Sequence, residues 1–204
     1  MIAIVTLTIA IHSRGPILGV DVATLDLVNR IRTPWLVDIF SVLTWAGDFL
    51  VASLALVVAC AAVALRRRER RPLWLGMAAV GLLAASVGTG KQVIARSRIP
   101  FAAGSFGDGG TSYPSGHATT AVVVGGCLVL LAAPALSVAR RRVAWCAMVG
   151  YAVLVGVSRL YLRQHWLSDV LVGWLLGTAI VCVLAVVFFA PPTRWAGQAA
   201  ADRG

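Results

Sequence analysis

The chain has 204 residues, of which 59% are hydrophobic and 13% are charged, and its mean hydropathy is +0.87. So high an apolar content excludes an ordinary soluble domain and is typical of a polytopic membrane protein. The net charge is +10, from 18 lysines and arginines against 8 acidic residues. Because the arginines stand between apolar runs, we interpret them as topology signals and phosphate or headgroup contacts, and we expect no nucleic-acid partner.

The first quarter of the chain predicts a short apolar segment followed by a helix at the membrane surface. Met1–Ile11 is apolar but shorter than the roughly 20 residues that cross hydrocarbon, so we expect a first membrane segment that is truncated, misjudged at its start or tilted. In His12–Gly47, apolar residues recur at helical spacing opposite polar ones such as Asp21, which is typical of an interfacial amphipathic helix. Pro34 predicts a break in this region.

Five longer apolar runs follow, and we predict each of them to be a membrane span. They are Phe49–Leu65, Leu73–Gly90, Ala118–Ala139, Val143–Val157 and Val170–Ala190. With the first segment they predict an all-α transmembrane bundle of about six spans. No hydrophilic segment is long enough to fold alone, so residues 1–204 are expected to form a single domain. Gly173 and Gly177 form a Gly-x-x-x-Gly pair that we interpret as a packing feature inside the bundle.

Two dense basic runs predict the orientation in the membrane. Arg66–Arg71 ends the second predicted span and Arg140–Arg142 ends the fourth, so both lie on one side of the membrane. The positive-inside rule makes that side the cytoplasm, although the opposite loops also hold cations, such as Lys91 and Arg159. We therefore expect a protein of the cytoplasmic membrane whose loops after the third and fifth spans share the extracytoplasmic face.

Three polar clusters fall on that face, namely Lys91–Pro100, Tyr113–His117 and Ser158–Asp169. Several cations with few carboxylates suit a phosphate pocket, because arginine forks match phosphate oxygens. Ser115-Gly116 ahead of a helix adds free backbone N–H groups and the positive end of the helix dipole. Each cluster also has a plainer interpretation: Ser115 fits a helix cap, and Lys91 and Arg98 fit cations that snorkel toward the interface. Their common face favours the phosphate site.

The third cluster contains the residue types of a histidine nucleophile. His165 and Asp169 are four residues apart, so on a helix they share one face, one turn apart. The carboxylate can then accept the proton of one imidazole nitrogen and leave the other to attack. A second histidine, His117, permits one imidazole to attack phosphorus while the other protonates the departing oxygen. The alternative is a set of interfacial anchors in which Arg159 and Arg163 face lipid headgroups.

Together the clusters resemble the signatures of the type 2 phosphatidic acid phosphatase superfamily, a family of membrane lipid phosphatases. Its signatures are Lys-x6-Arg-Pro, Pro-Ser-Gly-His and Ser-Arg-x5-His-x3-Asp. The chain matches them with Lys91-x6-Arg98, with Pro114–His117 and with Ser158–Asp169. In the first signature Ile99 intervenes before the proline, so Arg96 stands as the alternative to Arg98.

The resemblance implies a phosphatase that forms a phosphohistidine and needs no metal or other cofactor. By this resemblance His165 is the nucleophile, Asp169 orients it, and His117 is the general acid. The implied phosphate-binding residues are Lys91, Arg98, Ser115, Gly116 and Arg159.

The expected partner is a lipid phosphate in the membrane, and the sequence predicts no particular oligomeric state. Our first choice of substrate is a polyprenyl diphosphate with an undecaprenyl or decaprenyl chain. Phosphatidylglycerol phosphate, phosphatidic acid and polyprenyl-phosphoryl sugar phosphates stay open. Two other functions also stay open: phosphoryl transfer to another lipid or sugar, and transport of anions or lipids guided by buried cations.

Overall fold

The computed structural model describes residues 6, 8, 9, 17–99 and 110–189, and this part of the chain is built from α-helices with two short 3-10 helices. Five of its helices are long and apolar enough to cross a membrane. They are α4 (Phe49–Arg67), α5 (Arg71–Ile94), α6 (Gly116–Ala132), α7 (Val138–Tyr161) and α8 (Leu167–Phe189). The prediction of an all-α membrane bundle is confirmed, and these helices overlap five of the predicted spans. The predicted end of the fourth span at Ala139 is wrong: α6 ends at Ala132, and Arg140–Arg142 lie near the start of α7. Most of Met1–Ile11 lies outside the described residues.

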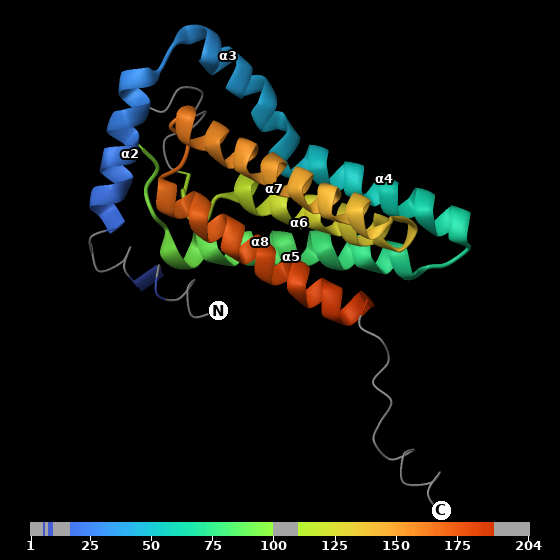
Figure 1. Ribbon diagram of the computed structural model, residues 1–204. Helices are drawn as coiled ribbons and strands as arrows, with labels where there is room; N and C mark the ends of the chain where they lie inside the picture. The colour runs from blue at the N-terminus through green and yellow to red at the C-terminus, as the bar shows by residue number, and fades with distance from the viewer. Residues whose placement is uncertain (1–5, 7, 10–16, 100–109, 190–204) are drawn as a thin grey trace, which may run out of the picture.

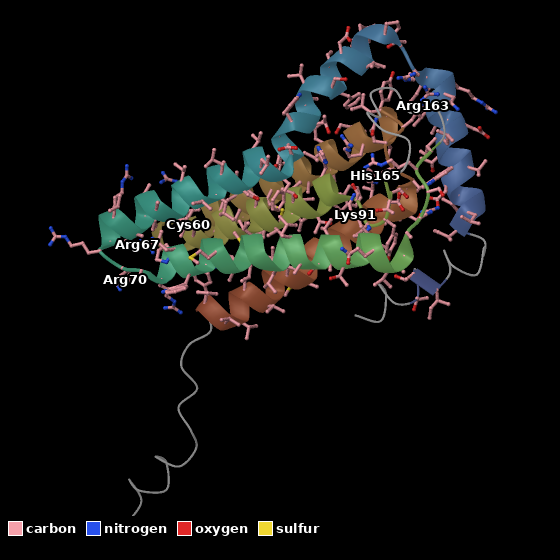
Figure 2. The ribbon with its side chains drawn as sticks, turned by 180° about the vertical axis from the view of Figure 1, so that it is seen from behind. Cys60, Arg67, Arg70, Lys91, Arg163 and His165 are labelled. Atoms are coloured by element: carbon pink, nitrogen blue, oxygen red, sulfur yellow. The ribbon has the colours of Figure 1, made fainter. Side chains whose placement is uncertain are left out.

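The five long helices run alternately in opposite directions, so each end of the bundle holds the N-termini of some helices and the C-termini of others (Figure 1). Helices α4, α6 and α8 begin at the same end at which α5 and α7 finish. We call it the polar end, because Lys91 and His165 lie there, and the opposite one the arginine end, because Arg67 and Arg70 lie there (Figure 2). Three helix N-termini, each with positive partial charge, therefore point toward the polar end.

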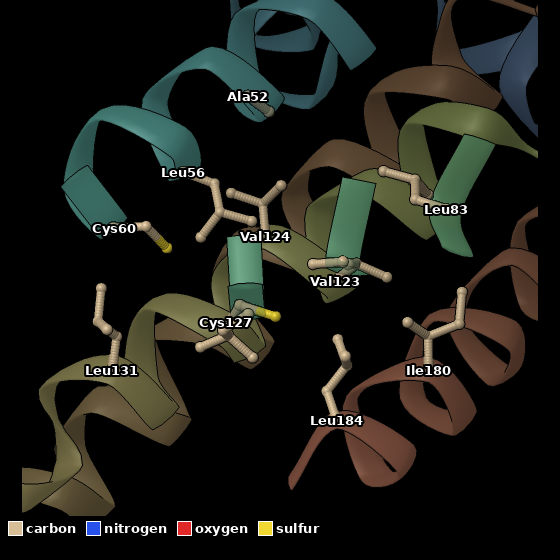
Figure 3. Packing of buried hydrophobic residues seen from close by; sticks show 12 residues of the cluster. Ala52, Leu56, Cys60, Leu83, Val123, Val124, Cys127, Leu131, Ile180 and Leu184 are labelled. Carbon is tan, nitrogen blue, oxygen red and sulfur yellow. The ribbon is translucent and has the colours of Figure 1, made fainter. Parts of the chain in front are cut away.

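Helix α6 is the central element of the bundle. It contacts α4, α5, α7 and α8, and twelve of its residues are buried. Figure 3 shows how its residues Val123, Val124 and Cys127 meet Leu56 of α4 and Leu184 of α8. A helix that is apolar all round belongs in the middle of such a bundle, where its neighbours cover every face.

The predicted glycine pair forms the contact between α8 and α6. A Cβ added at Gly177 would stand 2.7 Å from the Cβ of Val122, and one added at Gly173 would stand 2.8 Å from the backbone oxygen of Ser115. Both distances are shorter than real Cβ contacts, so the two helices approach this closely only because these positions lack side chains. The expected packing role of Gly173 and Gly177 is confirmed.

The predicted surface helix is present as two helices that form an elbow across the polar end (Figure 1). Helix α2 (Ile17–Ile31) stops three residues before Pro34, which opens α3 (Pro34–Leu43), so the predicted break is confirmed. Tyr161 at the end of α7 holds the elbow: its hydroxyl donates to the Ile31 oxygen at 3.0 Å and accepts from the Thr33 N–H at 2.9 Å.

Candidate active site

A cavity of about 380 Å³ lies at the polar end of the bundle. Its polar lining consists of Asp48, Lys91, Arg98, His117, Thr120, Arg159 and His165, with the backbone of Gly116, and its apolar lining comes largely from Phe49, Leu83, Ala84 and Val87 of α4 and α5. Six of the eight predicted site residues therefore line one space, although they come from parts of the chain up to 74 residues apart. The other two, Ser115 and Asp169, lie behind its wall.

His165 lies in the link between α7 and α8, and its side chain is 3% exposed. Its Nδ1 is 3.6 Å from Oδ2 of Asp169, which is an electrostatic contact longer than a hydrogen bond. Nδ1 has no hydrogen-bond partner among the described residues. The same Oδ2 accepts the backbone N–H of Trp166 at 3.0 Å. The carboxylate therefore faces Nδ1, and Nε2 is the ring nitrogen left for chemistry.

Burial favours the neutral form of this imidazole. It lowers the pKa of His165 below its ordinary value, and the nearby Arg159 lowers it further, against the opposing effect of Asp169. A neutral imidazole has the free lone pair that a nucleophile needs. The environment of His165 therefore suits attack at neutral pH.

The Pro-Ser-Gly-His segment starts α6 and is fastened to the start of α8. Ser115 is fully buried; its hydroxyl accepts the N–H of Ala118 at 3.5 Å, and its backbone N–H donates to the backbone oxygen of Asp169 at 3.1 Å. This link sets His117, the second residue of α6, against the same cavity as His165. Ser115 itself acts as the helix cap and does not line the cavity, so its phosphate-binding role stays a prediction.

Three cations on the cavity wall are held by neutral acceptors. Arg159 donates to Thr44 Oγ1 at 2.8 Å, Arg98 to Gln164 Oε1 at 3.1 Å, and Lys91 to the Thr111 oxygen at 3.2 Å. In the part of the chain that the structure describes, none of the three forms an ion pair with a carboxylate. Their positive charge is therefore available to an anion in the cavity.

Gly116 adds backbone to the same wall. A Cβ added there would meet only the Val87 side chain, at an ordinary 3.6 Å. The protein's own packing therefore does not require glycine at this position. The lack of a side chain instead leaves the N-terminal turn of α6 accessible from the cavity.

Arg96 and Arg98, the two alternatives for the first signature, lie in different places. Arg98 lines the cavity, and Arg96 does not. Arg96 donates through Nη1 to Oδ1 of Asp169 at 2.7 Å and through Nη2 to Oδ2 of Asp21 at 2.7 Å. The geometry favours Arg98 as the cavity cation and places Arg96 behind the nucleophile.

Sequence reasoning missed three residues at the polar end. Asp48 lines the cavity, but its Oδ1 accepts the N–H groups of Leu50 and Val51 and so caps α4. Thr44 holds Arg159. Asp21, predicted on the polar face of a surface helix, is 1% exposed because it contacts residues far away in the chain. The sequence does hold a signal that could have identified Asp48, an aspartate directly before an apolar run, which is typical of a helix cap.

Within the described residues, no group of three or more His, Cys, Asp and Glu side chains is arranged to hold a metal ion. The cavity instead gathers two imidazoles and three cations around an open space. Such a set can bind a phosphate group, attack its phosphorus and protonate the leaving oxygen.

Comparisons with known proteins concern the family and the fold. The family model described as the PAP2 superfamily matches residues 46–192. The fold is similar to the crystal structure of a transmembrane PAP2 type phosphatidylglycerolphosphate phosphatase from Bacillus subtilis, with a TM-score of 0.83 and 26% identity over 91% of this chain and 92% of that one. An undecaprenyl-diphosphatase of Sulfolobus acidocaldarius is 44% identical over 69 residues, or 34% of this chain and 30% of that protein. The chain thus aligns with less than a third of that relative's length.

Proposed function

The chain belongs to the PAP2 superfamily of membrane phosphatases, and from this premise we propose that it removes the terminal phosphate of a lipid through a phosphohistidine intermediate. The observation that carries the proposal is the cavity itself. In it, His165 with Asp169 behind its ring faces three cations that have no carboxylate partner among the described residues. A phosphate group in that space meets a nucleophile and fixed positive charge together.

The first chemical step transfers the phosphoryl group to the protein. Nε2 of His165 attacks the terminal phosphorus, the bond from phosphorus to the lipid oxygen breaks, and His117 donates a proton to that oxygen. Lys91, Arg98 and Arg159 stabilise the charge that develops on the equatorial oxygens. The free N–H groups at the start of α6 contribute to the same task.

The second step regenerates the histidine. A water molecule attacks the phosphorus of the phosphohistidine, His117 takes its proton, and the nitrogen–phosphorus bond breaks to release inorganic phosphate. Asp169 faces Nδ1 throughout and stabilises the positive charge on the phosphorylated ring. No step requires a metal ion, because the cations carry out the charge stabilisation that a metal would otherwise supply.

The substrate that we propose first is a polyprenyl diphosphate, and the matching segment of the undecaprenyl-diphosphatase supports it. The second candidate is phosphatidylglycerol phosphate, because the similar Bacillus subtilis structure covers nearly the whole chain. Phe49, Leu83 and Val87 give the cavity an apolar side toward α4 and α5, where a lipid chain can lie beside its phosphate. Such a wall accepts either lipid.

The test is phosphate release by the purified chain from a panel of lipids in detergent micelles. The panel holds a polyprenyl diphosphate, phosphatidylglycerol phosphate and phosphatidic acid, each with a ³²P label in the terminal phosphate. We expect release, with an acid-labile label on the wild-type protein, and neither with His165→Asn. Turnover by His165→Asn above trace level would refute the covalent mechanism. A phosphorylated lipid or sugar acceptor in place of free phosphate would instead identify a phosphotransferase.

A further inference from the structure

A buried ionic cluster lies behind the nucleophile, and two of its three members, Asp21 and Arg96, have no part in the chemical steps. Arg96 stands between Asp21 and Asp169, with side chains that are 11%, 1% and 0% exposed, respectively. Two carboxylates and one guanidinium in such a place are costly to desolvate, so each contact has to be satisfied. The three residues come from α2, from the segment after α5 and from α8.

Arg96 fixes the orientation of the Asp169 carboxylate. Its Nη1 donates to Oδ1 of Asp169, while Oδ2 faces His165 and accepts the N–H of Trp166. Both carboxylate oxygens are therefore engaged by different partners. Any rotation of the carboxylate that turned Oδ2 away from the imidazole would also break the contact with Arg96.

Asp21 in turn holds Arg96 and the start of α8. Its Oδ2 accepts from Nη2 of Arg96 at 2.7 Å and from the Ser168 hydroxyl at 2.6 Å, and its Oδ1 accepts the Ser168 N–H at 2.9 Å. That N–H belongs to the first turn of α8, where backbone donors lack partners within the helix. A residue of the surface helix α2 thus caps the helix that carries Asp169.

We propose that Asp21 is a positioning residue for phosphoryl transfer, which acts through Arg96 to hold the Asp169 carboxylate against His165. The inference rests on the proposed function, since it needs His165 to be the nucleophile. Asp21 does not line the cavity in which we place the substrate. Its loss should therefore slow the chemical step and leave substrate binding in place. A displacement of about 1 Å in such a site can cost on the order of 10²-fold in rate.

The first experiment compares Asp21→Asn with Asp26→Asn in the purified full-length protein. Asp26 lies on the same helix but is exposed, so its substitution makes the same charge change away from the cluster. The probes are farnesyl diphosphate and phosphatidylglycerol phosphate, each with ³²P in the terminal phosphate. We expect Asp21→Asn to lower kcat and the rate of acid-labile phosphohistidine formation by about 10-fold to 100-fold with KM nearly unchanged. Asp26→Asn should match the wild type.

A second variant separates positioning from simple stability. Asp21→Asn removes one of the two buried carboxylates that contact Arg96, which can lower the unfolding temperature. The double variant Asp21→Asn/Arg96→Gln replaces the ion pair with two neutral amides that can bond to each other. We expect its kcat to fall at least as far as that of Asp21→Asn, because Asp169 then lacks its guanidinium partner. Both variants are assayed well below their unfolding temperatures, where a loss that came from stability alone would disappear.

Three results would overturn the inference: wild-type kcat in Asp21→Asn, wild-type kcat in the double variant, or an effect confined to KM. Failure of the proposed function looks different. In that case the wild-type protein itself would carry no acid-labile phosphate, whatever the variants do.

Discussion

The two histidines of the cavity differ in where the chain holds them, and this difference favours different roles. His165 sits in the link before α8 with a carboxylate 3.6 Å from one ring nitrogen. His117 is the second residue of α6 and has no carboxylate bonded to it among the described residues. A ring backed by a carboxylate suits the nucleophile, which gains positive charge when phosphorylated, and the other suits the proton donor.

We therefore expect His117→Ala to slow turnover by about 10²–10⁴-fold. Some phosphohistidine should still form in this variant, because the nucleophile is intact. The loss should be larger for a lipid phosphate ester, whose alkoxide leaves poorly, than for a diphosphate, whose phosphate leaves well. Single-turnover assays with both substrates measure the difference. Equal losses on the two substrates would contradict the role of His117 as general acid, and His165→Asn, which removes all turnover, is the control.

The lowered pKa of His165 gives a prediction that needs no substrate. Burial disfavours the imidazolium, so the ring should stay neutral at pH 6.5, where an ordinary histidine is about half protonated, and should take up its proton only at lower pH. Protein labelled with ¹⁵N-histidine can be titrated by NMR, and the signal that disappears in His165→Asn identifies the residue. A titration midpoint at or above pH 6.5 would contradict the prediction.

The cavity cations predict that activity needs no divalent metal. Lys91, Arg98 and Arg159 supply the charge that stabilises the transition state, so phosphate release should continue in excess EDTA. Arg159→Ala should lower kcat in the presence and in the absence of the chelator alike. Complete loss in EDTA, with recovery on addition of magnesium, would count against the proposal.

At the scale of the helix, Gly173 lies where the packing of α8 against α6 also determines the position of the active-site segment at Ser115. A Cβ there would stand 2.8 Å from the backbone oxygen of Ser115, whose backbone N–H donates to the backbone oxygen of Asp169. Gly173→Ala should therefore push α6 away from α8, destabilise the protein by about 1–3 kcal/mol and lower kcat. Gly150→Ala in α7 is the matched control: an added Cβ there meets nothing within 4 Å, so the better helix former should be neutral or stabilising.

Unfolding temperature and lipid phosphate release measure both effects. A Gly173→Ala protein as stable and as active as Gly150→Ala would show that α8 can shift without disturbing the start of α6.

The sequence predicts best those helices that a pattern of neighbouring residues identifies. Hydropathy locates five spans because each is a continuous apolar run, and Pro34 marks the elbow because proline suits the first position of a helix. The signatures also indicate which residues gather at the polar end, since they fall at alternate span ends. Asp21 could not be predicted in the same way: its partner Ser168 is 147 residues away, and only the folded contact buries it.

At the scale of the whole molecule, the two ends of the bundle carry different charged residues. The exposed arginines around Arg67 and Arg70 lie at one end, and Lys91 and His165 lie at the other (Figure 2). Each juxtamembrane cation near an anionic surface is worth about 1 kcal/mol, so the arginine end should face the cytoplasm. The cavity would then meet lipids from the extracytoplasmic side, where carrier diphosphates are left after cell-wall polymer synthesis.

This orientation is tested with single cysteines at Asp26 and Glu69 in a protein without its four native cysteines. Both positions are exposed, and they lie on α2 at the polar end and in the turn between α4 and α5 at the arginine end. A membrane-impermeant thiol reagent on intact cells should label position 26 and spare position 69, and permeabilised cells should show both labelled. The reverse pattern would place the cavity in the cytoplasm, where the same chemistry would serve phospholipid synthesis and the recycling of an outer-leaflet carrier would be excluded.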